Sequence, residues 1–207
     1  MRLYYAPGTI SIAVVIALHE ADLPFEAIAV DFRSAAQTKP EYLAINPKGR
    51  VPALEADSGQ VLTETGAVLD YIAAIAPDAG LVPRDAGDAA HMRGVMYYLA
   101  STMHVNHAHK MRGSRWASAP ESHADMAATV PRTMADSAAH IEQHALRGDY
   151  VMGEDFSLAD PYLFVVSTWL RGDDVDIASY PKFAAFQRRM ISRASVQAAI
   201  EGGMIRV

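Results

Sequence analysis

The sequence predicts two domains, a small α/β domain followed by an all-α domain. Three observations support this. Strand-like and helical stretches alternate over residues 1–77, Gly and Pro concentrate in a linker at 78–87, and only helical stretches follow over 88–207. The chain has 207 residues, 51 % of them hydrophobic, which is enough apolar surface for a folded core in each part.

The first domain follows a βαβ–loop–ββα order. A helix between two adjacent strands forms a βαβ unit, whose strands are parallel. Thr9 or Ser11 can cap the first helix, and Thr63 can cap the last one. Asp57-Ser58-Gly59 is typical of a hairpin turn. In chain order, we expect a strand at 2–6, a helix ending near 21, a strand at 25–31, hairpin strands at 51–56 and 60–62, and a helix at 64–76.

The second domain shows helical periodicity, interrupted by Gly and Pro. One capping box, Ser157-Leu-Ala-Asp160, begins an apolar stretch, and we interpret it as a structural signal rather than a site. The expected helices lie at about 88–111, 121–147, 158–170, 181–192 and 195–201.

Charge and hydropathy exclude several classes of protein. The 18 Lys+Arg and 24 Asp+Glu give a net charge of −6, which argues against binding to nucleic acid or an anionic membrane. The longest strongly apolar run, 10–18, is too short to cross a bilayer, which takes about 20 residues. Arg2 is the only basic residue before the sequence becomes strand-like, so we expect no cleavable signal and a cytoplasmic protein.

The chain contains no cysteine, which excludes disulfides, thiolate metal sites and a cysteine nucleophile. His104 and His107 share a helix face, whereas His109 points elsewhere and no carboxylate is close in sequence. We therefore expect no metal site and no covalently bound cofactor. Any thiol chemistry must use a thiol that arrives with a substrate.

Two short motifs suggest a ligand with an amino-acid head group. The free N–H groups at the helix start Thr63-Glu64-Thr65 can hold a carboxylate, and Glu64 can accept from an ammonium group. The alternative is an ordinary capped helix. At Val51-Pro52, a cis bond would expose the backbone of Val51 to a ligand's peptide group, although trans is the commoner state of such bonds.

Four blocks together resemble the cytosolic glutathione transferases, and most of all their bacterial beta class. They occur in the family's order and spacing and extend over the whole chain. The blocks are Leu-Tyr-Tyr-Ala-Pro-Gly-Thr-Ile-Ser at 3–11, Tyr-Leu-Ala-Ile-Asn-Pro-Lys-Gly-Arg-Val-Pro-Ala-Leu at 42–54, Leu-Thr-Glu-Thr-Gly-Ala-Val at 62–68 and Phe-Ser-Leu-Ala-Asp-Pro-Tyr-Leu-Phe at 156–164.

The resemblance implies a thioredoxin-like domain that binds glutathione as co-substrate and a helical domain that completes a pocket for a hydrophobic electrophile. It also implies a homodimer and a role in detoxification. Two alternatives stay open on the same fold: a non-catalytic glutathione- or ligand-binding protein, and a glutathione-dependent isomerase or reductive enzyme. The implied glutathione contacts are Arg50, Val51, Pro52 (the cis-proline position), Glu64, Thr65 and Ser101.

The catalytic residues depart from the beta-class pattern. Ile10 stands where that class has its cysteine, so another group must activate the thiol of glutathione. Ser11, in the first turn of the first helix, is the first choice, and Thr9 is the alternative. The histidine that beta-class proteins carry on the first helix of the second domain matches His104, which can support the charge on sulfur.

Two groups of basic residues have open roles. The lysine that the beta class carries near position 35 is Ala35 here, so Arg33 or Lys39 would have to supply its charge. Lys110, Arg112 and Arg115 end a predicted helix. We interpret these basic residues as compensating the negative end of the helix dipole, and the alternative is that they recruit an anionic substrate.

Overall fold

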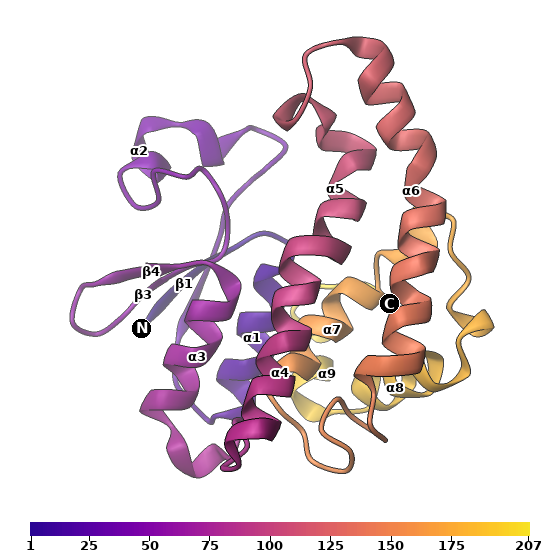
Figure 1. Cartoon of the computed structure of the whole chain (residues 1–207). Coiled ribbons are helices and arrows are strands. Elements are labelled where there is room, and N and C mark those ends of the chain that lie inside the picture. Colours follow the sequence, from indigo (N-terminus) through magenta and orange to yellow (C-terminus); the bar gives the residue numbers. More distant parts are fainter. The chain divides into compact units, whose positions relative to one another are not determined.

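The computed structural model describes all 207 residues and divides the chain into two compact units (Figure 1). The first unit comprises Met1–Val82 and Ile191–Val207, and the second comprises Pro83–Met190. The boundary near residue 82 lies inside the predicted linker. The last 17 residues differ from the expectation of a single helical domain over 88–207, because they pack with the first unit.

The first unit is built on a four-stranded sheet in the order β2-β1-β3-β4, as in a thioredoxin-like domain. Strands β1 and β2 are parallel, β3 is antiparallel to both of its neighbours, and the predicted βαβ unit and hairpin are confirmed. The strands are β1 (Arg2–Tyr5), β2 (Glu26–Ala29), β3 (Ala53–Glu55) and β4 (Val61–Thr63).

Helix α1 (Ser11–Glu20) is the buried helix of this unit. Every residue from Ser11 to Leu18 is buried, because the helix packs against the sheet, α3 (Thr65–Ile75) and α9 (Ala194–Glu201). Its sequence is apolar on all sides, as a buried helix requires. The short α2 (Pro40–Leu43) completes the unit.

The expected helix caps differ from the observed ones. The N-cap residues are Ile10 for α1 and Glu64 for α3, and no side chain caps either helix. Thr63 ends strand β4 instead of capping α3. The first turn of α3 therefore keeps its backbone N–H groups free of side-chain partners, which matters for the site below.

The C-terminal segment is tied to α1 by polar contacts. Glu20 accepts from Nε and Nη2 of Arg193 at 2.8 and 2.6 Å and from Oγ of Ser195 at 2.5 Å. Farther along, the Gly8 N–H donates to the Met204 carbonyl at 2.8 Å. Sequence periodicity assigns residues 195–201 to a helix but carries no information about which domain that helix packs against.

The second unit is all-helical, as predicted, with two isolated β-bridges in the loop before α7. The predicted helix at 88–111 is continuous but contains a π-helical turn, η3 (Leu99–Met103), between α4 and α5 (Figure 1). The helices are α4 (Ala86–Tyr98), α5 (His104–Arg112), α6 (Pro120–His140), α7 (Ala159–Ser167) and α8 (Pro181–Ile191), whose last residue falls in the first unit.

The capping box at the start of α7 is a folding contact. The fully buried Asp160 carboxylate accepts from the N–H and hydroxyl of Ser157 at 2.7 and 2.8 Å, and from the Val151 N–H at 2.9 Å. It thus ties the preceding loop to the helix. Among all the helices, none is long and apolar enough to cross a membrane.

Candidate functional site

One end of the sheet gathers three of the predicted segments. Tyr4 pairs with Ala53, and Ala53 pairs with Thr63, all in antiparallel register. The loop after β1, the segment before β3 and the helix start after β4 therefore leave the sheet at the same end. Ala6, Pro52 and Glu64, which lie next to these strand ends in the sequence, are therefore at this end of the sheet.

The segment before β3 is held in a fixed conformation. The Val51-Pro52 bond is cis, in agreement with the position that the resemblance assigns. The carbonyl of Arg50 accepts from the Tyr42 hydroxyl at 2.6 Å and from Nδ2 of Asn46 at 2.7 Å. Burial raises the pKa of Tyr42 to about 12, so this hydroxyl stays a donor at neutral pH. The two bonds fix the backbone that presents Val51.

The start of α3 has the geometry of an open anion site. Glu64 has φ 70°, a left-handed conformation that costs about 1–3 kcal/mol in a residue other than glycine and is often found at functional sites. Its exposed carboxylate accepts from Nζ of Lys48 at 2.6 Å, and the same ammonium donates to Oγ1 of Thr63 at 3.0 Å. Glu64 therefore already holds one ammonium group beside free backbone N–H groups.

The two candidate hydroxyls for thiol activation differ in exposure. Ser11 is fully buried, and its Oγ accepts from the Ala6 N–H at 3.1 Å. Its Oγ also lies 2.7 Å from Oγ1 of Thr9, which donates to the Ala6 carbonyl at 2.8 Å. Thr9 is half-buried, so it is the hydroxyl that a ligand can reach, with Ser11 behind it.

His104 and Ser101 belong to the second unit, at the π-helical turn. Ser101 is exposed and donates to the Tyr97 carbonyl at 2.8 Å. The half-buried ring of His104 lies 4.9 Å from the Trp169 ring, centroid to centroid. Turns of this kind inside α-helices are frequent at functional sites, and sequence periodicity gave no sign of it.

The basic cluster at the end of α5 has a structural contact. Nζ of Lys110 donates to the Gly172 carbonyl and lies 3.6 Å from the Asp174 carboxylate. Lys110 thus joins the end of α5 to the turn η6 (Leu170–Asp173). No group of three or more metal-binding side chains comes together in the structure.

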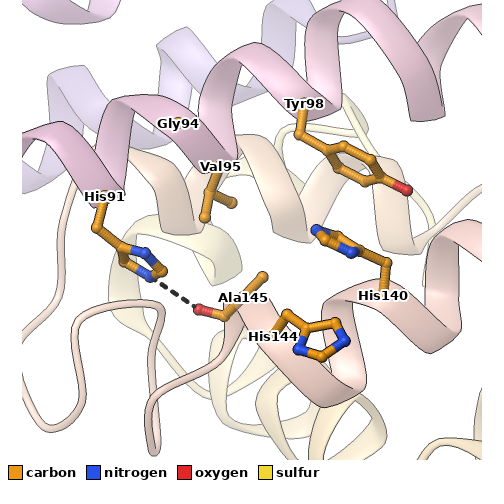
Figure 2. A pocket seen from close by; sticks show the side chains of 7 residues that line it. All are labelled: His91, Gly94, Val95, Tyr98, His140, His144 and Ala145. Atoms are coloured by element: carbon orange, nitrogen blue, oxygen red, sulfur yellow. Dashed lines mark hydrogen bonds between the residues drawn. The ribbon is translucent and has the colours of Figure 1, made fainter.

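A pocket in the second unit was not expected from the sequence. It has a volume of about 210 Å³ and lies between α4 and the end of α6 (Figure 2). Figure 2 shows the Tyr98 ring beside that of His140, and the His91 ring directed at the Ala145 carbonyl. The only sequence signal is helical spacing, as in His140 and His144. Its lining is His91, Gly94, Val95, Tyr98, His140, His144 and Ala145, none of them a predicted site residue.

Comparison with known proteins agrees with this geometry. Residues 1–74 match the family described as glutathione S-transferase, N-terminal domain. The chain is 30 % identical, over 97 % of each sequence, to "Glutathione S-transferase GstA" of Escherichia coli O157:H7. The chain belongs to the glutathione S-transferase family.

Two solved structures show which transferases this chain resembles over its whole length. It is similar to a glutathione transferase homologue from Sulfitobacter with bound glutathione, with 64 % identity, a TM-score of 0.97 and 98 % of each chain covered. It is also similar to a beta-class transferase of Sphingomonas chungbukensis, with 33 % identity, a TM-score of 0.84 and 98 % coverage of both. The transferase fold and function predicted from the sequence are confirmed, in a chain without cysteine.

Proposed function

We propose that this glutathione transferase joins the thiolate of glutathione to hydrophobic electrophiles in the cytoplasm, as a detoxifying enzyme. The observation that carries the proposal is the uncapped start of α3, where Glu64 and Thr65 follow β4 beside the Val51-Pro52 bend. A carboxylate acceptor and free N–H groups at one helix start suit the zwitterionic γ-glutamyl head group.

The rest of glutathione follows from the sheet geometry. An extended peptide that starts at Glu64 and Thr65 passes the end of β3, where the backbone of Val51 can pair with its cysteinyl part. The ammonium of the head group competes with Lys48 for Glu64 or joins it there. Arg50 is exposed next to this segment and can meet a carboxylate of the ligand.

The thiol is then activated by hydrogen bonding. A free thiol has a pKa near 8.5, and a decrease of two units needs about 2.7 kcal/mol of preferential binding to the thiolate. We assign direct contact with sulfur to Thr9, the reachable hydroxyl, whose single proton turns from the Ala6 carbonyl to the thiolate when glutathione binds. The buried Ser11 supports Thr9 by donating its own proton to Oγ1 of Thr9. The start of α1 adds its positive dipole end.

The second unit supplies His104 and Ser101 to the same reaction. His104 can donate to the sulfur or accept its proton, and Ser101 lies one turn before it. The proposal also includes a homodimer, in which closed two-fold symmetry is the commonest arrangement. Holding both substrates in one site supplies the proximity that accelerates their reaction.

The decisive test is glutathione binding to Glu64→Ala by calorimetry. Loss of a charge-assisted hydrogen bond should weaken binding by about 1.5–3 kcal/mol. Glu41→Ala removes an exposed carboxylate of the same unit outside the site, and it should bind as the wild type does. Unchanged affinity in Glu64→Ala would contradict the assigned head-group site.

Turnover separates catalysis from mere binding. We expect the wild type to conjugate glutathione with an aryl halide and to release halide in equal amount. Glutathione that binds without any turnover of aryl halides or other electrophiles would instead support the non-catalytic binding protein.

A further inference from the structure

The second unit contains a buried carboxylate with an unusual lack of partners. Asp173, the last residue of η6, is fully buried. Its Oδ2 accepts from Nδ1 of His107 at 2.6 Å, whereas its Oδ1 has no hydrogen-bond partner. Burying a carboxylate costs several kcal/mol unless both oxygens are well satisfied. An apolar pair of similar size would give the fold at least as much stability, so stability alone does not account for this contact.

The ring of His107 is oriented from two sides. It stacks on Trp169 with 4.4 Å between centroids and 20° between planes, and its Nδ1 faces Asp173. With the carboxylate as acceptor, Nδ1 carries a proton, so Nε2 is an acceptor in the neutral ring and a donor in the protonated one. Nε2 has no partner within the chain, and 33 % of the side chain is exposed. The pair thus presents one nitrogen prepared for proton transfer.

This pair lies next to the histidine already assigned to the reaction. His104 and His107 are one turn apart on α5, and both rings contact Trp169. Lys110 and Asp174 carry the other charges near the pair, and they hold each other at the end of the helix. His107 is therefore the next proton-carrying group along α5 from His104.

We propose that His107 transfers a proton to the second substrate, with Asp173 as its positioning residue, and that the preferred electrophiles are α,β-unsaturated carbonyl compounds. This inference rests on the proposed function, because it places the second substrate at the His104 face of the helical unit. It adds the class of electrophile and two residues that the resemblance does not assign.

The proton balance of the reaction favours this class. The thiolate forms a sulfur–carbon bond at the β-carbon, and the π electron pair of the C=C bond moves to give an enolate. The Nε2–H bond of protonated His107 breaks, and its proton joins the enolate as a C–H or O–H bond. The neutral ring keeps Nδ1–H on Asp173 and regains a proton from solvent, which has received the thiol proton of glutathione. Glutathione and the electrophile therefore give the adduct without an oxidant or reductant.

An aryl halide provides the contrasting substrate. There the sulfur–carbon bond forms while the halide leaves with its electron pair, so the product needs no proton from the enzyme. We expect His107→Gln to lower kcat/KM for an enone about 100-fold and for the aryl halide less than about threefold. Asp173→Asn should lower kcat for the enone while KM stays unchanged, because Asp173 acts only through the ring of His107.

Two further variants control for folding and for the choice of histidine. His107→Phe combined with Asp173→Val keeps a ring on Trp169 and removes both polar partners, which is close to neutral for stability, and it should show the same selective loss. His109 also lies on α5, and its ring contacts Trp116, so His109→Gln should react as the wild type does.

The outcomes are separable. Equal losses with both electrophiles, or an undiminished enone reaction in the folded variants, would overturn the role of His107 and leave the transferase function intact. A wild type that conjugates neither electrophile would contradict the proposed function itself.

Discussion

Thr9 and Ser11 are two residues apart, and burial gives their hydroxyl groups different roles. Ser11 is sealed behind the loop, where its oxygen is the acceptor for the Ala6 N–H. Thr9 is bonded to the same residue but reaches the surface. Replacing the Ser11 hydroxyl leaves the Ala6 N–H without its acceptor. Replacing the Thr9 hydroxyl takes away a hydrogen-bond donor that the protein offers to the substrate.

We therefore predict that Ser11→Ala mainly affects stability and that Thr9→Val mainly affects catalysis. Ser11→Ala should lower the free energy of unfolding by about 1–3 kcal/mol, and Thr9→Val should lower kcat/KM about tenfold, which is about 1.4 kcal/mol. Urea unfolding and conjugation kinetics measure the two, with the exposed Ser118→Ala as control. A Ser11→Ala variant of normal stability whose bound thiol loses its thiolate absorbance would show that Ser11 itself contacts the sulfur.

At the scale of elements, α9 is held on α1 by a half-buried ion pair. Burial acts to raise the pKa of Glu20, but hydrogen bonds from Arg193 and Ser195 outweigh it and hold this pKa below its ordinary value. A carboxyl whose pKa is lower in the folded state stabilises the fold above its unfolded pKa, and this contribution disappears as pH falls through the folded pKa.

Glu20→Gln should accordingly destabilise the protein in a pH-dependent way. We expect a loss of about 2 kcal/mol at pH 7, which stays constant down to about pH 5 and shrinks below about pH 4 as the wild-type carboxyl takes up its proton. Denaturant titrations of both proteins over this range measure the difference. A difference that grows toward acid would have the wrong sign for this ion pair.

At the scale of the whole molecule, the absence of cysteine limits the chemistry. No residue can form a mixed disulfide with glutathione, so any reaction uses glutathione that is bound without a covalent link.

The apolar side chains of Tyr97, Met111 and Trp116 are 65 %, 90 % and 46 % exposed on the second unit. Large exposed apolar groups favour contact with another surface.

We predict no disulfide exchange through this protein. After incubation with oxidised glutathione, mass spectrometry should find the unmodified chain of 22.4 kDa. Any reduction of a small disulfide that the protein accelerates must use glutathione bound in the site, so no mixed disulfide with the chain should appear during the reaction. A chain heavier by one glutathionyl group would contradict this prediction.

We also predict a homodimer in solution. Light scattering at micromolar concentration should give about twice the monomer mass of 22.4 kDa. Dilution of the sample gives the control, because a specific dimer dissociates with a single constant. A mass near that of the monomer at every concentration would exclude the dimer.

The sequence by itself determined the βαβ–ββα order and the helical second unit, because strand and helix periods and turn residues are local signals. It also determined the family, because four separate blocks of sequence match it in the same order and spacing. The resemblance also put the cis-proline position at Pro52, where the structure has a cis bond. Only the tertiary structure decided that residues 191–207 pack on α1, that Ser11 is inaccessible, and that Asp173 meets His107. These facts depend on burial and on contacts between residues far apart in the chain, such as Glu20 and Arg193, which are 173 positions apart, and local periodicity carries no signal for such contacts.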